Sequence, residues 1–275
     1  MIAKPEQLSL FEQMRNAAPT LSDEAVMRVL CEELLDEGEV EGPPTPVKML
    51  ASLRGINDVK TAEQPFAGVL APSKNGFAVR VRQADGRGRQ RFTISHETGH
   101  TLLPGFREAR QYRCNGEQTW LERMCDVAGA ELLLPRRFFE PLMAEGDFNL
   151  ETVEELAGLF DASIEASARR AVGLHPEPAM LLILSDRHKP AEAGREEELP
   201  TKLRLDYSVR RGEWPFVKPH KSARESGLGR ALQGEILNEQ GSIDELCADA
   251  IGAVRISAKR YGREGRVLAL VRRAK

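Results

Sequence analysis

Residues 91–100 read Arg-Phe-Thr-Ile-Ser-His-Glu-Thr-Gly-His and contain the pattern HExxH, with histidines at positions 96 and 100. On a helix, side chains four positions apart lie roughly 40° apart around the axis, so His96 and His100 share one face. Two neutral imidazoles on one face can bind a single cation, and nitrogen donors suit Zn²⁺. Glu97 follows the first histidine and is placed to take a proton from a water that the metal activates. The run therefore predicts a zinc hydrolase with Glu97 as general base.

The motif is informative only on a helix, and its surroundings favour one. The apolar residues Phe92, Ile94, Leu102 and Leu103 fit a helix over about 91–103, directly before a Pro-Gly pair. The alternative is a pair of surface histidines on an ordinary helix. The chain has 5 histidines, and two of them fall in the pattern, which favours the metal site.

A catalytic zinc needs a third protein ligand and one open position. The expected helix over 118–134 offers Glu122 and Asp126, one turn apart, so one can bind the metal while the other holds a ligating histidine. We favour Glu122 as the ligand, because glutamate is an established partner of two histidines at zinc. The competing candidates are Cys114, Cys125, Asp126 and Glu131, of which Cys125 is expected to face the core. The other histidines are isolated in sequence and are predicted to be structural or on the surface: His175, His188 and His220.

These two segments resemble a known family. The run 91–100 is similar to the RFTxAHExGH signature of the ImmA/IrrE metallopeptidases, and residues 122–135 (ERMCDVAGAELLLP) are similar to that family's ExxAN-x-FAAxLLxP segment. The resemblance covers about residues 20–175. Two departures occur: Cys125-Asp126 stands where Ala-Asn is common, and Ala128-Gly129 stands where Phe-Ala is common.

The resemblance implies a site and an activity. It makes Glu122 the third zinc ligand, and it allows Asp126 to support a ligating histidine. It also implies that the substrate is a helix-turn-helix transcriptional repressor, cleaved after a stress or mobile-element signal. The residues alone support a cytoplasmic zinc-dependent peptide-bond hydrolase. Zn²⁺ is the default metal for this ligand set, and Mn²⁺ or Fe²⁺ are alternatives.

The pattern along the chain predicts an α+β fold. We expect a mainly helical, zincin-like metallopeptidase domain with a small antiparallel sheet, then helix-turn-helix-like helices, then a smaller mixed α/β C-terminal domain. The small sheet is expected from strands near 66–70 and 77–81, joined by a turn that contains Asn75-Gly76. The expected parts are a flexible N-terminal end (1–20), the metallopeptidase domain (21–148), the helical pair (149–175) and the C-terminal domain (179–275).

Two parts of this scheme carry further expectations. In the helical pair, Ser163 can cap the second helix, which offers few base-reading groups beyond Arg169 and Arg170. A packing or substrate-docking role is therefore favoured over DNA binding. In the C-terminal domain we expect strands, with helical stretches over 223–237 and 243–260, and a reduced ligand-sensing domain of the GAF type is one interpretation.

Composition limits the class of protein. With 41% hydrophobic and 29% charged residues and a net charge of −3, the chain of 275 residues has enough apolar mass for a core, which excludes disorder throughout. No run of about 18 apolar residues is present, so no membrane span is expected. The start lacks a secretory signal pattern, and the 4 cysteines form no CxxC pair, so a cytoplasmic location with reduced thiols is expected. Basic residues outnumber acidic ones over 200–275, which we interpret as a solvated face.

Three functions are compatible with these observations. The first, which we favour, is a zinc endopeptidase that acts on a specific repressor. The second is a binding module that sequesters a repressor without cutting it. The third is a DNA-binding regulator that uses residues 151–174 and the basic C-terminal part.

Overall fold

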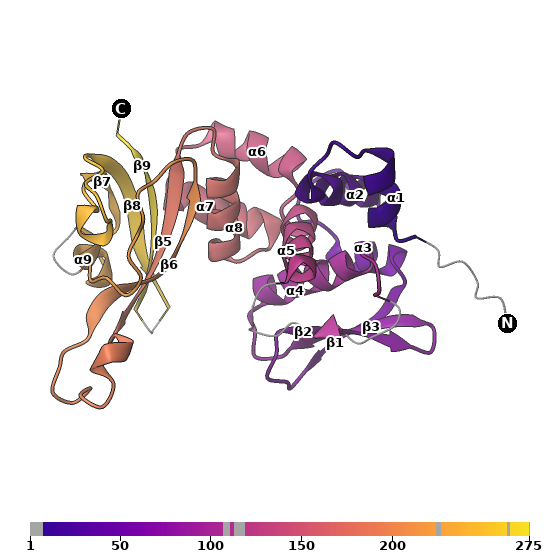
Figure 1. Ribbon diagram of the computed structural model, residues 1–275, viewed down its shortest axis with the longest axis horizontal. Coiled ribbons are helices and arrows are strands. Elements are labelled where there is room, and N and C mark those ends of the chain that lie inside the picture. The colour runs from indigo at the N-terminus through magenta and orange to yellow at the C-terminus, as the bar shows by residue number, and fades with distance from the viewer. Residues whose placement is uncertain (1–7, 107–110, 113–118, 224–226, 263–264, 275) are drawn as a thin grey trace. The chain divides into compact units, whose positions relative to one another are not determined.

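The computed structural model describes residues 8–106, 111–112, 119–223, 227–262 and 265–274. The fold is α+β, as predicted (Figure 1). The chain divides into two compact units. Unit 1 comprises Met1–Phe139 and Ala157–Ser163, and unit 2 comprises Glu140–Leu156 and Ile164–Lys275. Each unit has its own sheet and its own helices, so each is described by itself.

Unit 1 is mainly helical. Its helices are α1 (Leu10–Ala17), α2 (Asp23–Glu37), α3 (Val47–Leu53), α4 (Arg87–His100) and α5 (Trp120–Leu133), and α6 (Arg136–Glu145) begins in this unit. The expected loose end over 1–20 is corrected here, because α1 lies within it. Ser9 and Glu12 form a capping box at the start of α1, and Phe11 is buried.

The sheet of unit 1 has the strand order β1-β3-β2-β4, from β1 (Ile56–Ala62), β2 (Gly68–Ser73), β3 (Gly76–Arg82) and β4 (Gln111–Tyr112). Strands β2 and β3 form the expected antiparallel hairpin, with Ser73 opposite Gly76. The sheet is mixed rather than antiparallel, because β1 runs parallel to β3. The sequence did not predict β1, since most of its residues are exposed or half-buried and polar, and they carry no apolar alternation.

Helix α4 is the central element of unit 1. It packs against β2 and β3 on one side and against α5 on another (Figure 1). Helix α5 in turn packs against α2, and their apolar side chains share one core. This position explains why the segment Thr93–His100 is entirely buried.

Unit 2 is built on an antiparallel sheet with the strand order β6-β5-β9-β8-β7. The strands are β5 (Ala179–Arg187), β6 (Lys202–Arg211), β7 (Leu237–Gly241), β8 (Val254–Tyr261) and β9 (Arg266–Arg273). Helix α8 (Ile164–Leu174) packs on β5, β6 and β9, and the short α9 (Gly227–Leu232) packs on β7, β8 and β9.

The expected helical stretches over 223–237 and 243–260 are wrong for most of their length. They contain the short α9, a 3₁₀ turn (Asp244–Leu246) and strand β8. In β8, Val254, Ile256 and Ala258 alternate with more polar residues, and their buried side chains join the core of unit 2. This period of two is typical of a half-buried strand.

The two helices expected around residues 161–163 are present. Helix α7 (Leu150–Phe160) ends where Asp161 takes a left-handed conformation (φ 53°), and α8 begins after Ser163. Their grouping as a helix-turn-helix-like domain stays a prediction, because the residues of α7 are divided between the two units. Within the described residues, no helix is both long and apolar enough to cross a membrane.

Candidate metal centre

The HExxH motif lies on the last turns of α4, as the sequence predicts. His96, Glu97 and His100 are buried, with 0%, 0% and 2% of their surface exposed. The imidazole centroids of His96 and His100 are 5.3 Å apart and their planes are inclined by 72°. The two rings therefore lie one turn apart on the same side of the helix, where two nitrogens can serve one ion.

Small residues bring α5 close to this side of α4. A Cβ atom on Gly99 would lie 2.7 Å from Ala128 Cβ and 3.2 Å from Cys125 Cα, so only glycine permits the observed separation. Nearby, the Phe92 ring packs 3.1 Å from where a Cβ on Gly129 would be. The Phe92 ring thus fills the space beside Gly129.

Glu122 projects from the first turn of α5 toward both imidazoles. Its Oε2 is 3.3 Å from His96 Nε2, and its Oε1 is 3.6 Å from His100 Nε2. Burial by itself raises the pKa of the Glu122 carboxyl, but the proximity of the two imidazoles outweighs that effect, so the pKa lies below its usual value. The two Nε2 atoms therefore converge on one carboxylate.

Asp126 lies one turn further along α5, behind His96. Its Oδ1 is 2.9 Å from His96 Nδ1. A carboxylate at that distance accepts a hydrogen bond from Nδ1–H, which places the lone pair of the neutral ring on Nε2, on the side of Glu122. Asp126 thus sits where it can orient the histidine.

The Glu97 carboxylate lies against the sheet. A Cβ atom on Gly68 of β2 would lie 2.6 Å from Glu97 Oε1 and 2.3 Å from Thr93 Cγ2. The backbone of β2 therefore lies directly against the Glu97 carboxylate. Sequence reasoning missed Gly68, although a glycine inside the expected strand over 66–70 can mark the close approach of another group.

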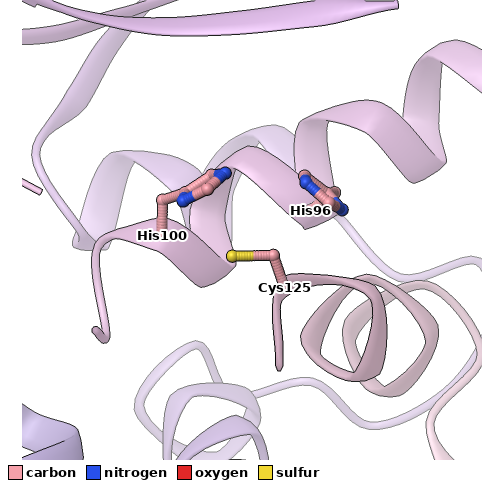
Figure 2. Close-up of side chains that lie close together, drawn as sticks. All are labelled: His96, His100 and Cys125. Atoms are coloured by element: carbon pink, nitrogen blue, oxygen red, sulfur yellow. The ribbon is translucent and has the colours of Figure 1, made fainter. Parts of the chain in front are cut away.

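Cys125 also approaches the histidines (Figure 2). It is fully buried in the core shared by α2 and α5, as expected. Nevertheless, one ligand atom from each of His96, His100 and Cys125 lies within 4.8 Å of the others. From the sequence, Cys125 was expected either to face the core or to bind the metal. In the structure its side chain is in the core and also lies close to the two histidines.

The remaining candidates lie elsewhere. Glu131 is 3.3 Å from Arg28 in an ion pair with α2, and Cys114 lies outside the described residues. In unit 2, His175 packs on the Phe148 ring with the centroids 4.3 Å apart, and His188 bonds the carbonyl oxygen of Leu199. These roles agree with the structural assignment made from the sequence.

The donor set fits a divalent transition metal. Two imidazole nitrogens and a carboxylate are the ligand types that zinc takes in hydrolases, and they come from two helices held together by close packing. An HExxH motif on a helix, with a carboxylate facing its two histidines, is typical of metallopeptidases.

Comparison with known proteins finds similarity to one peptidase family over part of the chain. Residues 58–172 match the model of a peptidase family described as the IrrE N-terminal-like domain. The chain is 28% identical over 148 residues to the radiation response metalloprotease IrrE of Deinococcus deserti. That alignment covers 49% of this chain and 52% of the relative, so the chain spans about half the length of the curated relative it matches. Residues 58–172 are therefore similar to the peptidase domain of the ImmA/IrrE family.

A solved structure is similar in fold. It is described as a Mycobacterium tuberculosis transcriptional regulator, with a TM-score of 0.53 and 12% sequence identity. The similarity covers 95% of this chain and 80% of that one. At this identity the likeness concerns the fold alone.

Proposed function

We propose that this chain is a zinc-dependent endopeptidase that cleaves a helix-turn-helix transcriptional repressor. One observation carries the proposal: both Nε2 atoms of the HExxH motif converge on Glu122, 3.3 and 3.6 Å away, while Glu97 is buried beside them. The match of residues 58–172 to a peptidase family supports the peptidase activity. The repressor as substrate rests on the resemblance to the ImmA/IrrE family.

In the proposed mechanism His96, His100 and Glu122 hold the ion. The bound ion would supply Lewis acidity, which polarises the scissile carbonyl and acidifies the attacking water. Glu97 takes the proton from that water and passes it to the amine that leaves. Asp126 keeps His96 in the tautomer that presents Nε2, and the β2 backbone at Gly68 restricts the position of the Glu97 carboxylate.

Glu97→Gln tests the activity. The amide keeps the size of the side chain but cannot accept the proton, so metal content should be unchanged while cleavage falls by about 10²–10⁴-fold. The assay incubates the purified chain with helix-turn-helix repressors encoded near its gene, with metal content measured on the same samples. His96→Ala, which should lose both metal and cleavage, is the comparison. Cleavage by Glu97→Gln at the wild-type rate would refute the role of Glu97.

Cys125 supports a second candidate function, the binding module that sequesters a repressor without cutting it. If Cys125 and Glu122 both bound the ion together with the two histidines, four protein ligands would close the coordination sphere, as in structural zinc sites. Substitution with Co²⁺ distinguishes the two, because a thiolate ligand adds a sulfur-to-cobalt charge-transfer band in the near ultraviolet. The endopeptidase predicts no such band, whereas a band that disappears in Cys125→Ser would favour the binding module.

The DNA-binding candidate is disfavoured by the side chains of α8. Arg169, one of its two basic groups, forms an ion pair with Glu165 at 3.2 Å. Its guanidinium also lies over the Tyr207 ring of β6, 4.8 Å from the centroid. An arginine engaged in this way packs the helix on the sheet of unit 2, which supports the packing role.

A further inference from the structure

One face of the sheet in unit 2 carries a row of cationic side chains. Along β8, Arg255, Ser257 and Lys259 share this face, because side chains two positions apart on a strand point the same way. Along β9, Arg266 and Arg272 share it. The antiparallel register places Arg255 directly opposite Arg272. Like charges directly opposite each other destabilise a sheet unless something compensates them.

At one end of this face, carboxylates on two helices neutralise the positive charges. Lys259 Nζ is 2.7 Å from Glu154 of α7, and Arg266 is 2.8 Å from Glu165 of α8. At the other end, neither Arg255 nor Arg272 forms an ion pair with any carboxylate of the described residues. The two guanidinium groups therefore lack the partners that the other cations of this face have.

A cavity lies beside the two arginines that lack carboxylate partners. It has a volume of about 30 Å³, and Arg255 and Arg272 line it together with Asp147, Asn149, Asn238 and Ser257. A water molecule needs about 10–15 Å³ by this kind of measure, so the cavity holds roughly two waters or one small charged group. Asn149 and Ser257 are buried, with 8% and 6% of their surface exposed.

The buried polar groups of the cavity are arranged as donors. Ser257 Oγ accepts a hydrogen bond from Leu150 N–H at 2.9 Å, which leaves its hydroxyl hydrogen to donate. Asn149 Oδ1 accepts from Thr152 N–H at 2.9 Å, which leaves its NH₂ group as a donor. Both bonds lie at the N-terminus of α7, where the helix dipole favours negative charge.

We propose that this cavity binds one oxyanion group, a carboxylate or a phosphate, of a small ligand. Two arginines match such groups because each guanidinium presents paired N–H donors to two oxygens. The one acid at the cavity is Asp147, whose side chain is exposed and which forms no ion pair with either arginine. The negative charge of Asp147 repels an anion in the cavity, so its removal should strengthen binding.

The test measures thermal unfolding of the full chain during titration with sodium phosphate, with sodium acetate, and with sodium chloride at equal ionic strength. We expect phosphate or acetate to raise the melting temperature beyond chloride, and the stronger of the two identifies the group. Arg255→Gln and Arg272→Gln should each weaken the binding about tenfold or more, and Asp147→Asn should tighten it. Arg210→Gln on the exposed edge strand β6 is the matched control and should bind as the wild type does.

Several outcomes would overturn the proposal. One is equal stabilisation of the wild type by all three salts. Another is an equal loss in Arg210→Gln, which would mean that only net charge matters. Retained binding in the Arg255→Gln and Arg272→Gln variants would place any bound anion elsewhere, for example at the metal centre, which these substitutions leave intact.

Discussion

Replacing Gly99 by alanine tests the packing that brings the two ligand-bearing helices together. The added methyl would lie 2.7 Å from Ala128 Cβ, whereas carbon atoms pack at about 3.5–4.0 Å. Helix α5 must then move away from α4 by roughly 1 Å. Metal–ligand distances vary by only about 0.2 Å, so Glu122 would no longer reach the position that the imidazoles share.

The expected magnitudes follow from opposing effects. Overpacking costs about 1–3 kcal/mol, while alanine in a helix gains up to about 1 kcal/mol over glycine. The free energy of unfolding of the metal-free chain should therefore fall by about 1 kcal/mol. Displacement of Glu122 should weaken zinc binding by about tenfold or more, which corresponds to about 1.4 kcal/mol.

The assay combines competition for zinc against a chromophoric chelator with denaturant unfolding of the metal-free chain. Gly158→Ala is the matched control, because Gly158 lies in helix α7 with no atom within 4 Å of the added Cβ. That variant should be slightly stabilised and should bind zinc normally. If Gly99→Ala binds zinc with wild-type affinity, the reasoning about helix separation is refuted.

Three further predictions concern other contacts. Gly68→Ala should reduce cleavage more than metal affinity, because its Cβ would meet Glu97 Oε1 at 2.6 Å; equal losses in kinetic and chelator assays would contradict this. Asp126→Ala should lower zinc affinity by about 10–100-fold, and an unchanged affinity by isothermal titration would remove its orienting role. Glu154→Gln should destabilise unit 2 at neutral pH. Although burial raises the pKa of Glu154, bonds with Lys259 and Tyr261 lower it below 4.5, so the carboxylate stabilises the fold above that pH. The difference in unfolding free energy between wild type and variant should vanish as the pH falls through the lowered pKa, and a difference that persisted in acid would exclude this linkage.

The sequence predicted the parts of the site that depend on helical periodicity. His96, Glu97 and His100 follow from one motif on one helix, and Glu122 and Asp126 follow from one turn of the next, with both helices present near the expected bounds. The same periodicity predicted α7 and α8 around Asp161. The positions of these residues on their helices could be predicted because contacts within one helix are fixed by residue spacing. Their roles at a metal stay predictions.

What the sequence did not predict depends on contacts between elements. The approach of Cys125 to the histidines follows from the separation of α4 and α5, which Gly99 permits. The proximity of Gly68 to Glu97 follows from how β2 packs on α4. Strand β1 was missed because Asp58 and Lys60 interrupt any apolar pattern, so its place beside β3 depends on contacts between strands, among them the ion pair of Asp58 with Arg80.

The polar character of β1 has a consequence for how the chain behaves when concentrated. As the outer strand of its sheet, β1 exposes one row of backbone groups that another molecule could extend. Asp58 and Lys60 place charges along that row, and Lys202 and Arg211 do so on β6, an outer strand of the second sheet. Charges at such borders discourage strand-by-strand growth between copies, so samples should resist fibril formation at high protein concentration.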